Sequence, residues 1–286
     1  MRSSNQCGCL RKDLSRVARG EALKDYLALH LRDLPYFRAL LRAIEARFFK
    51  DILLPAPVLD LGCGDGHFAS LAFDQPLDMG LDPWWGPIRE AATLTSYKYL
   101  VCAAGDQMPY PGDYFSSAIS NSVLEHIQNL EPVIAETARV LKPGAPFIFC
   151  VPNHRFLDSL SIGRWLDKIR FTGLADCYRR FFNRISRHHH CDSYDVWEER
   201  LIKYGFEIVD WWDYFPPRSL QVLEWGHFFG VPSWISKLLF NRWILSASWW
   251  NLALTDRLVR PYYDQDPRSS KGVYSFYISR RHPESS

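Results

Sequence analysis

One segment of the chain runs from an apolar strand through a glycine-rich turn into the start of a helix. It covers residues 58–68 and has the sequence Val-Leu-Asp-Leu-Gly-Cys-Gly-Asp-Gly-His-Phe. Glycine tolerates a tight turn and lets the main chain approach a bound ligand closely, and the helix that follows offers free N–H groups. This strand–turn–helix unit predicts a binding site for a ligand that contains a nucleoside.

The spacing of the glycines separates two kinds of ligand. A dinucleotide site has the pattern G-x-G-x-x-G, which seats a pyrophosphate on the helix start. This turn is G-x-G-x-G instead, and Asp60 precedes it. A carboxylate there would repel a phosphate, but it suits a ligand that carries an ammonium and a sulfonium. The turn resembles the first motif of the class I S-adenosylmethionine-dependent methyltransferases, in which such an acid lies near the methionine end of the cofactor.

Two further acidic positions fit this resemblance. Asp82 ends the segment Met-Gly-Leu-Asp at residues 79–82, about 20 residues past the first glycine, where an acid can accept both ribose hydroxyls. Residues 104–110 resemble the family's GD-x-x-x-P segment. That likeness implies that Asp106 accepts the adenine amino group and that the residues after it flank the ring.

The match continues into the second half of the core. Residues 120–127 are similar to the turn after the family's fourth strand, and residues 140–146 to its approach to strand five, with Ala145 in place of the usual second glycine. The resemblance covers about residues 55–152, with a weaker echo at 190–210, and implies S-adenosylmethionine as cofactor and methyl transfer as reaction. The cofactor-binding residues that it implies are Asp60, Gly62, Cys63, Gly64, Gly66, Asp82, Pro83, Asp106, Gln107, Met108, Asn121 and Ser122.

Alternating strand and helix patterns predict a Rossmann-like α/β fold with a parallel, doubly wound sheet. The first five expected strands lie near residues 57–61, 77–81, 99–102, 115–120 and 146–151. A helix over 193–204, ended by Gly205, leads to a sixth strand at 206–215, and the last strand covers 272–280. In the family's topology the last strand is antiparallel and lies between the fifth and sixth. The expected sheet is therefore seven-stranded and mostly parallel, with helical cap insertions.

The chain divides into six expected parts. They are an N-terminal tail and helical cover (1–54), the cofactor-binding core (55–152), a basic amphipathic insertion (153–190), a core helix with strand six (191–215), a Trp-rich helical cap (216–271), and the last strand with a tail (272–286). The insertion and the cap both follow the carboxyl ends of strands, where open α/β folds bind ligands. We therefore expect them to form the roof of the acceptor pocket.

This roof has an unusual composition. The insertion carries eight Arg or Lys against three Asp, a balance of +5, and seven of the 11 tryptophans lie between residues 211 and 250. Aromatic residues at helical spacing can simply pack the core of a cap. They can also line a pocket for a large apolar or aromatic acceptor, or contact a membrane, because indoles favour such boundaries and basic flanks suit anionic headgroups. The sequence leaves these alternatives open.

Methyl transfer depends mainly on positioning, and a general base is needed only if the acceptor must lose a proton. The catalytic candidates are His190, with Asp192 and Tyr194 as neighbours that could orient it, and His126. The resemblance implies that His126 faces the sulfonium, and the alternative is that it packs under the adenosine. The neighbours His188–His190 cannot all converge on one ion without a turn, so we expect no metal site.

Two other function classes would leave different marks in the sequence. A non-catalytic S-adenosylmethionine-binding protein would keep Asp60, Asp82 and Asp106 but have a sealed acceptor face. A nucleic-acid methyltransferase would carry an N-P-P-[YFW]-type motif after strand four to hold a flipped base, whereas this chain has Asn-Ser-Val-Leu at residues 121–124. A net charge of +2 also implies no general attraction to polyanions. We expect a small-molecule or lipid-linked acceptor, and no nucleic-acid partner.

Composition and targeting signals give a location. The start, Met1 to Arg19, lacks the apolar region of a secretory signal, and the charge-free stretch 243–255 has 13 residues, fewer than the about 20 that span a membrane. Seven cysteines without disulfide-like spacing indicate a reducing compartment, and the pair Cys7 and Cys9 has no second pair to complete a zinc site. The expectation is a cytoplasmic protein, with peripheral contact at the inner membrane face through 153–190 and 216–271 as an alternative. The sequence does not indicate an oligomeric state.

Overall fold

The computed structural model describes residues 24–229, 244 and 249–283. Its centre is a seven-stranded sheet with the strand order β3-β2-β1-β4-β5-β7-β6. The strands are β1 (Val58–Leu61), β2 (Leu77–Asp82), β3 (Tyr97–Cys102), β4 (Ser117–Asn121), β5 (Pro146–Pro152), β6 (Phe206–Tyr214) and β7 (Tyr274–Arg281). Strands β1 to β5 pair in parallel, and β7 is antiparallel to both β5 and β6. The predicted Rossmann-like sheet, with its antiparallel last strand between the fifth and sixth, is confirmed.

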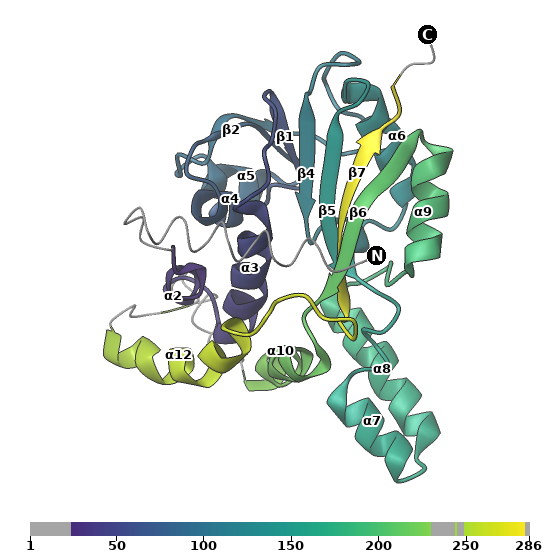
Figure 1. Cartoon of the computed structure of the whole chain (residues 1–286). Helices are drawn as coiled ribbons and strands as arrows, with labels where there is room; N and C mark the ends of the chain where they lie inside the picture. Colours follow the sequence, from purple (N-terminus) through teal and green to yellow (C-terminus); the bar gives the residue numbers. More distant parts are fainter. Residues whose placement is uncertain (1–23, 230–243, 245–248, 284–286) are drawn as a thin grey trace.

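Helices cover both faces of this sheet (Figure 1). They are α2 (Tyr26–Leu31), α3 (Tyr36–Phe49), α4 (His67–Ala72), α5 (Trp85–Ala91), the 3-10 helix η1 (Leu124–His126), α6 (Leu130–Val140), α7 (Ser161–Lys168), α8 (Thr172–Ser186), α9 (Tyr194–Lys203), α10 (Pro217–Phe229) and α12 (Trp249–Tyr263). Side chains alternate along each strand, so one face packs against α3 and the other against α6 and α9. The central strands β1, β4 and β5 are therefore buried on both faces, whereas the outer strands β3 and β6 keep exposed residues.

Helix α3 supplies the first half of the cover. Its apolar residues recur at intervals of three and four, as in Phe37, Leu40, Leu41, Ile44 and Phe48, and all of these are buried. The ring of Phe48 packs against aromatic side chains of the far edge of the sheet, with ring centroids 5.1–5.3 Å away on β6 and β7. Helix α3 therefore packs against the sheet as far as the strands β6 and β7.

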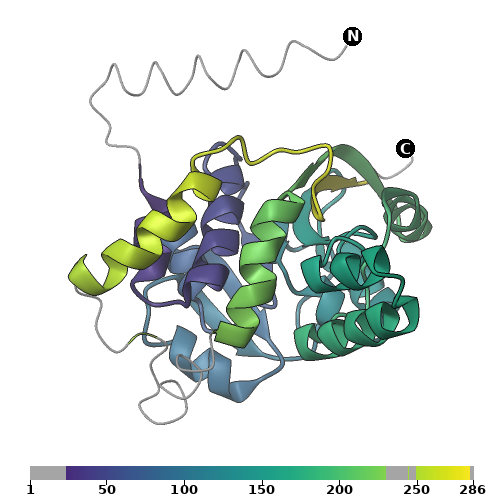
Figure 2. The same cartoon turned by 90° about the horizontal axis from the view of Figure 1, so that it is seen from below.

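The insertion and the cap both lie at the edge of the sheet where the parallel strands end (Figures 1 and 2). Helices α7 and α8 follow β5 and form a hairpin, while α10 follows β6 and packs on α3. That packing needs glycine at position 226, because a Cβ there would lie 2.4 Å from Phe37. Buried Glu224 of α10 accepts hydrogen bonds from the N–H groups of Ser161 and Ile162 and from the Tyr178 hydroxyl. The cap and the hairpin are therefore held together.

The three tryptophans of this stretch whose side chains the structure describes lie on two different elements, β6 and α10. Trp211 and Trp212 lie on β6, where Trp212 stacks on Phe276 at 4.7 Å and carries the Arg268 guanidinium over its ring. These two therefore lie on the sheet and not in the core of the cap, which was one of the alternatives. Trp225 lies partly exposed on α10. The remaining four members, Trp234, Trp243, Trp249 and Trp250, have side chains outside the described part of the chain.

Two further expectations concern membranes and cysteines. Across the described residues, no helix has both the length and the apolar character that crossing a bilayer requires. Cys63, Cys102, Cys150, Cys177 and Cys191 are all free thiols, whereas Cys7 and Cys9 lie outside the described residues.

Candidate cofactor and acceptor site

The glycine turn after β1 is open on one side. Gly62 has φ +79°, and a Cβ there would lie 2.4 Å from a Val123 methyl carbon, so this glycine lets the turn contact the segment after β4. Gly64 has φ +55°, and a Cβ there would meet no described atom within 4 Å. The main chain at Gly64 therefore faces space that a ligand can occupy.

Two buried carboxylates flank this open turn, at the ends of neighbouring strands. Asp60 accepts a hydrogen bond from the Tyr97 hydroxyl at 2.6 Å, and Asp82 accepts from the N–H groups of Gly64 at 3.1 Å and Trp84 at 2.9 Å. Burial raises the pKa of Asp60 to about 7, against the lowering effect of the Tyr97 hydrogen bond, and burial also raises the pKa of Asp82. Among the described residues neither carboxylate forms an ion pair, so the site favours a ligand that brings positive charge.

The segment expected to flank an adenine follows β3. Asp106 and Gln107 are exposed, whereas Met108 is buried and its N–H donates to Glu136 of α6 at 2.9 Å. Arg139 of α6 donates to the carbonyl of Met108 at 3.2 Å. Helix α6 thus fixes the loop and leaves the two polar side chains ahead of Met108 free to meet a ligand. The remaining residues expected here differ in exposure, since Cys63 is buried beside the glycine turn and Pro83 is exposed after β2.

The side chains at the end of β4 face α3. Asn121 and Ser122, expected to contact the cofactor, both donate hydrogen bonds to the carboxylate of Glu45, each at 2.8 Å. Arg42 donates to the same carboxylate at 2.9 Å and to the Asn121 carbonyl at 3.3 Å, and the Tyr214 hydroxyl donates to it at 2.9 Å. Glu45 is fully buried and holds four donors. The side chains of Asn121 and Ser122 therefore anchor the turn after β4 to α3, and a contact of this turn with the cofactor stays a prediction.

Sequence reasoning missed Glu45 and Arg42. A signal was present, because Glu45 occupies a core-facing position of α3 beside Ile44 and Leu41, where a charged residue needs a partner. The Arg42 guanidinium also lies near enough to Asp60 and Glu125 to oppose the effect of burial, which raises the pKa of both carboxyls. Arg42 is therefore a cation that acts on the carboxyls on both sides of the β1 and β4 ends.

The two predicted catalytic histidines meet at the segment after β4. His126 belongs to η1 in this segment, and His190, which follows α8, contacts it. His190 donates from Nε2 to the Ile127 carbonyl at 3.0 Å, and its Nδ1 lies 3.4 Å from Asp192. His126 donates from Nδ1 to the Arg187 carbonyl at 3.0 Å, which leaves the lone pair of Nε2 for another group. Both ring nitrogens of His190 therefore have protein partners. Nε2 of His126 has no hydrogen-bond partner among the described residues.

The sheet order, the open glycine turn and the two buried carboxylates beside it are the features expected of an α/β protein that binds a cationic nucleoside. A family model described as a methyltransferase domain matches residues 31–210, more than half of the chain. The chain therefore belongs to this methyltransferase domain family, and family and fold together identify S-adenosylmethionine as the cofactor. The buried carboxylates and the open main chain at Gly64 fit this molecule, which carries an ammonium and a sulfonium.

Curated relatives resemble part of the chain. The human mitochondrial ubiquinone biosynthesis O-methyltransferase is 28% identical over 146 residues, which are 45% of this chain and 38% of that protein. The malonyl-[acyl-carrier protein] O-methyltransferase of Methylococcus capsulatus is 32% identical over 104 residues, 33% of this chain and 37% of that protein. The matched region thus spans less than two-fifths of either relative.

Solved structures share the fold over most of the chain. A Thermotoga maritima S-adenosylmethionine-dependent methyltransferase, described as a possible histamine N-methyltransferase, has a TM-score of 0.52 at 13% identity, covering 86% of this chain and 90% of that one. The [4+2]-cyclase SpnF has a TM-score of 0.50 at 18% identity, covering 86% and 82%. At such identities the likeness establishes the fold alone, and these two neighbours show that the fold hosts different reactions.

Proposed function

We propose that this protein transfers the methyl group of S-adenosylmethionine to a small-molecule acceptor that is apolar, aromatic or lipid-linked. The observation that supports cofactor binding best is the pair Asp60 and Asp82, which lie on either side of the open main chain at Gly64. Both are buried carboxylates that form no ion pair with any residue that the structure describes. The two curated relatives are named for O-methylation, one in ubiquinone biosynthesis and one on malonyl-acyl carrier protein. Both names favour an acceptor other than nucleic acid.

The three acidic residues at the site have distinct proposed tasks. Asp60 faces the ammonium at the methionine end, Asp82 accepts the ribose hydroxyls, and Asp106 accepts the adenine amino group. Arg42, the cation near Asp60, is placed to pair with the carboxylate of the same ligand. When bound, the cofactor supplies an electrophilic methyl group. Holding it between α3 and the glycine turn fixes the direction of attack and excludes water, which is where most of the acceleration of such a transfer arises.

On the acceptor side, we assign His126 and His190 different tasks. The fixed ring of His190 supports the turn that carries His126. Burial lowers the pKa of His126, so its ring is neutral at pH 7 and Nε2 offers a lone pair to a proton of the acceptor or to a cation. A neutral ring also avoids placing a second positive charge beside a sulfonium.

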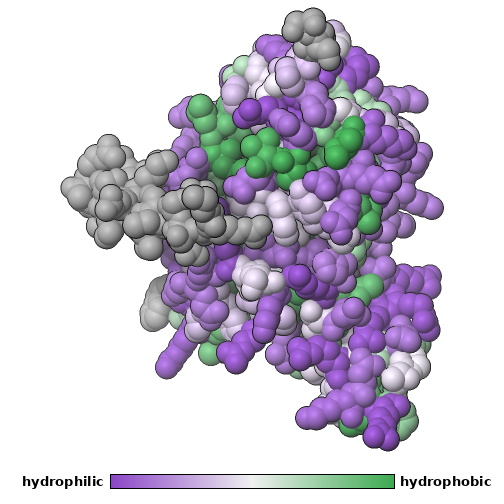
Figure 3. All heavy atoms as spheres, turned by 45° about the vertical axis from the view of Figure 1, so that its right-hand side comes forward, coloured by the Kyte–Doolittle hydropathy of each residue, from purple (hydrophilic) through white to green (hydrophobic). Residues whose placement is uncertain are grey.

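The hairpin of α7 and α8 supports an apolar or lipid-linked acceptor. It projects from the body of the protein (Figure 3), and its exposed apolar side chains are Trp165, Ile169, Phe171, Leu174, Phe181 and Ile185. All three aspartates of the insertion form ion pairs with one residue, Arg179. These aspartates therefore form no ion pair with the exposed basic side chains of the hairpin, which are Arg164, Lys168, Arg170, Arg180 and Arg184. We propose that this surface rests on an anionic membrane.

Calorimetric titration with S-adenosylmethionine, followed by transfer of a radiolabelled methyl group to an acceptor panel, tests the proposal. The panel contains phenols with and without a long apolar chain, a carboxylate on acyl-carrier protein, and RNA. We expect cofactor binding together with turnover that is faster on the chain-bearing phenols. Cofactor binding without turnover on any acceptor would favour the non-catalytic binding protein, and methylation of RNA alone would contradict the assigned acceptor class.

A further inference from the structure

Three potential metal ligands converge beside the acceptor side of the site. Glu125 and His126 belong to η1, and His188 lies in the loop after α8, 62 positions further along the chain than His126. One carboxylate oxygen of Glu125 and one ring nitrogen of each histidine all lie within 4.8 Å of one another. The Glu125 oxygen Oε1 is 3.8 Å from Nε2 of His126.

One oxygen of the buried Glu125 carboxylate lacks a hydrogen-bond partner in the described part of the chain. The residue is 1% exposed, and its oxygen Oε2 has no hydrogen-bond partner among the described residues. The nearby guanidinium of Arg42 is paired at 2.9 Å with Glu45 and does not hydrogen-bond to Glu125. A buried carboxylate oxygen without a hydrogen-bond partner points to a positive ligand that the described chain does not itself provide.

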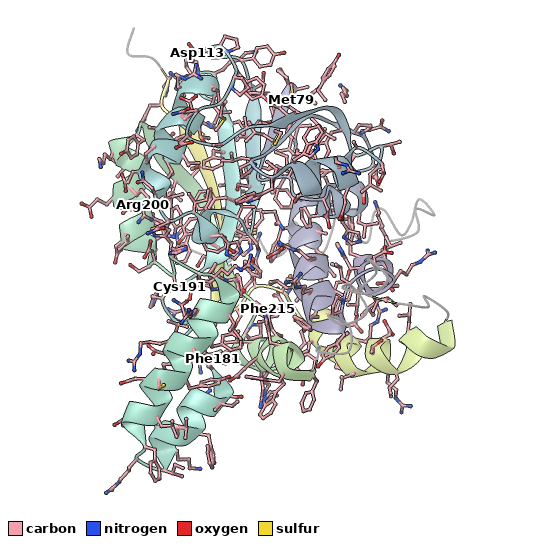
Figure 4. The ribbon with its side chains drawn as sticks, turned by 180° about the vertical axis from the view of Figure 1, so that it is seen from behind. Met79, Asp113, Phe181, Cys191, Arg200 and Phe215 are labelled. Atoms are coloured by element: carbon pink, nitrogen blue, oxygen red, sulfur yellow. The ribbon has the colours of Figure 1, made fainter. Side chains whose placement is uncertain are left out.

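The two histidines present their nitrogens as metal ligands do. Nδ1 of His126 donates to the Arg187 carbonyl, so the ring is oriented by the main chain and Nε2 faces Glu125. Nδ1 of His188 lies 3.8 Å from the sulfur of Cys191, which sits where α8 returns to the sheet (Figure 4). Each ring thus has one nitrogen with a protein partner, which leaves the other nitrogen for an ion.

The donor set indicates the kind of ion. Two imidazole nitrogens and one carboxylate oxygen suit first-row transition metals such as Zn²⁺, whereas Mg²⁺ and Ca²⁺ prefer oxygen ligands alone. Ligand atoms at about 2.1 Å from a zinc ion lie roughly 3.4 Å apart, so the present separations need only a small closure. His126 can supply it, because its side chain is 43% exposed.

We propose that Glu125, His126 and His188 form a binding site for one divalent transition-metal ion, with at least one coordination position left open toward the acceptor. The site goes beyond the proposed methyl transfer, and it assigns His126 to an ion in place of a proton. His190 takes no part, because both of its ring nitrogens have protein partners. An oxygen atom of an acceptor could take the open position, where a bound cation would lower its pKa.

The experiment uses the full-length protein, freed of metal with a chelator and titrated with Zn²⁺ in competition with a chromophoric chelator. We expect one equivalent to bind, and Co²⁺ in its place to give the visible absorption of a four- or five-coordinate nitrogen and oxygen site. Glu125→Gln and His188→Gln should each weaken Zn²⁺ binding by about tenfold or more. His189→Gln is the matched control, because it alters the same run of histidines without touching the cluster, and it should bind as the wild type does.

Several results would overturn the proposal. One is that the wild type binds Zn²⁺ no more tightly than Glu125→Gln does. Another is that more than one equivalent binds with equal affinity, and a third is that His189→Gln loses as much affinity as the cluster variants. Each result would place the ion on the exposed histidine run. Circular dichroism and thermal unfolding check that each variant folds, and His126→Gln replaces any variant that does not. Calorimetry with S-adenosylmethionine in the metal-free protein is a separate measurement. Cofactor binding without zinc binding would refute this site alone.

Discussion

The carboxylate of Glu45 on α3 accepts a hydrogen bond of 2.9 Å from the hydroxyl of Tyr214 at the end of β6, 169 residues further along the chain. The same carboxylate holds Arg42, Asn121 and Ser122. One buried acid thus connects the N-terminal cover, the turn after β4 and the far edge of the sheet. Its contacts fix where α3 lies over the proposed cofactor site.

Replacing Glu45 by glutamine should destabilise the fold strongly. The variant leaves the Arg42 guanidinium without its counter-charge and turns one accepting oxygen into a donor that faces other donors. Losing one partner of a buried ion pair costs about 3–5 kcal/mol, and we expect roughly 2–4 kcal/mol because Arg42 is partly exposed. Urea unfolding followed by circular dichroism measures it. Glu199→Gln, at an exposed position on α9, is the control, and equal stability of the two variants would show that the network is unimportant.

Replacing Asp82 by asparagine should weaken S-adenosylmethionine binding while sparing the fold. Each charge-assisted hydrogen bond from a ribose hydroxyl contributes roughly 1.5–3 kcal/mol, so losing one should raise Kd by about ten- to a hundredfold. Titration calorimetry gives the value, with Asp195→Asn on the exposed surface of α9 as control. Unchanged affinity in Asp82→Asn would mean that the ribose does not bind at the end of β2.

Cofactor affinity should rise with pH through about 7. Because burial raises the pKa of Asp60 to about 7, this carboxyl is mostly protonated at pH 6 in the free protein and ionised at pH 8. A cationic ligand favours the ionised form, so binding at pH 6 should release about one proton from Asp60, and binding at pH 8 almost none. Calorimetry in buffers of different ionisation enthalpy counts these protons.

The variant Asp60→Asn isolates this proton from that of Glu125, whose pKa burial raises to about 8. The difference in proton release between wild type and variant at pH 6 belongs to position 60, since the ligand is the same in both titrations. No difference would show that Asp60 does not face the positive end of the cofactor.

Removing apolar contacts at the tip of the hairpin should reduce membrane binding without affecting the cofactor. Phe171 and Leu174 are 60% and 56% exposed, and changing both to serine removes side chains that would enter the lipid interface. We expect at least about a tenfold loss in partitioning to phosphatidylglycerol-containing vesicles, and weaker wild-type binding at high salt because the flanking charges are basic. Flotation measures both. The double change Val196→Ser and Ile202→Ser on α9 is the control, and an equal loss there, or no wild-type binding at all, would refute the membrane surface.

The elements that the sequence predicted well are the ones encoded locally. Apolar runs that end in glycine or aspartate located Asp60 and Asp82 at the carboxyl ends of adjacent strands, because strand, turn and helix start lie within a dozen residues of each other. Gly205, with φ +79°, ends α9 as the helix-stop signal indicated. In such cases the residue itself carries the constraint.

Contacts between distant segments could not be predicted in the same way. Glu45 meets Asn121 and Ser122 across 76 and 77 residues, and the packing angle of α3 on the sheet decides those hydrogen bonds. Within the histidine run the sequence singled out His190 alone, and it gave no sign that the turn after α8 sends His188 toward Glu125 and His190 toward Ile127. A single sequence gives no periodic signal for such pairings, since each depends on where two elements meet in three dimensions.

The buried carboxylate of Glu224 joins two insertions that leave the sheet from different strands, and Gly226, two residues on, seats the same helix against Phe37 of α3. Helix α10 therefore contacts both the protruding hairpin and α3, the helix that carries Arg42. Moving the hairpin away from α10 would leave the Glu224 carboxylate buried without its donors, so we expect the hairpin, α10 and α3 to keep their mutual positions as one unit.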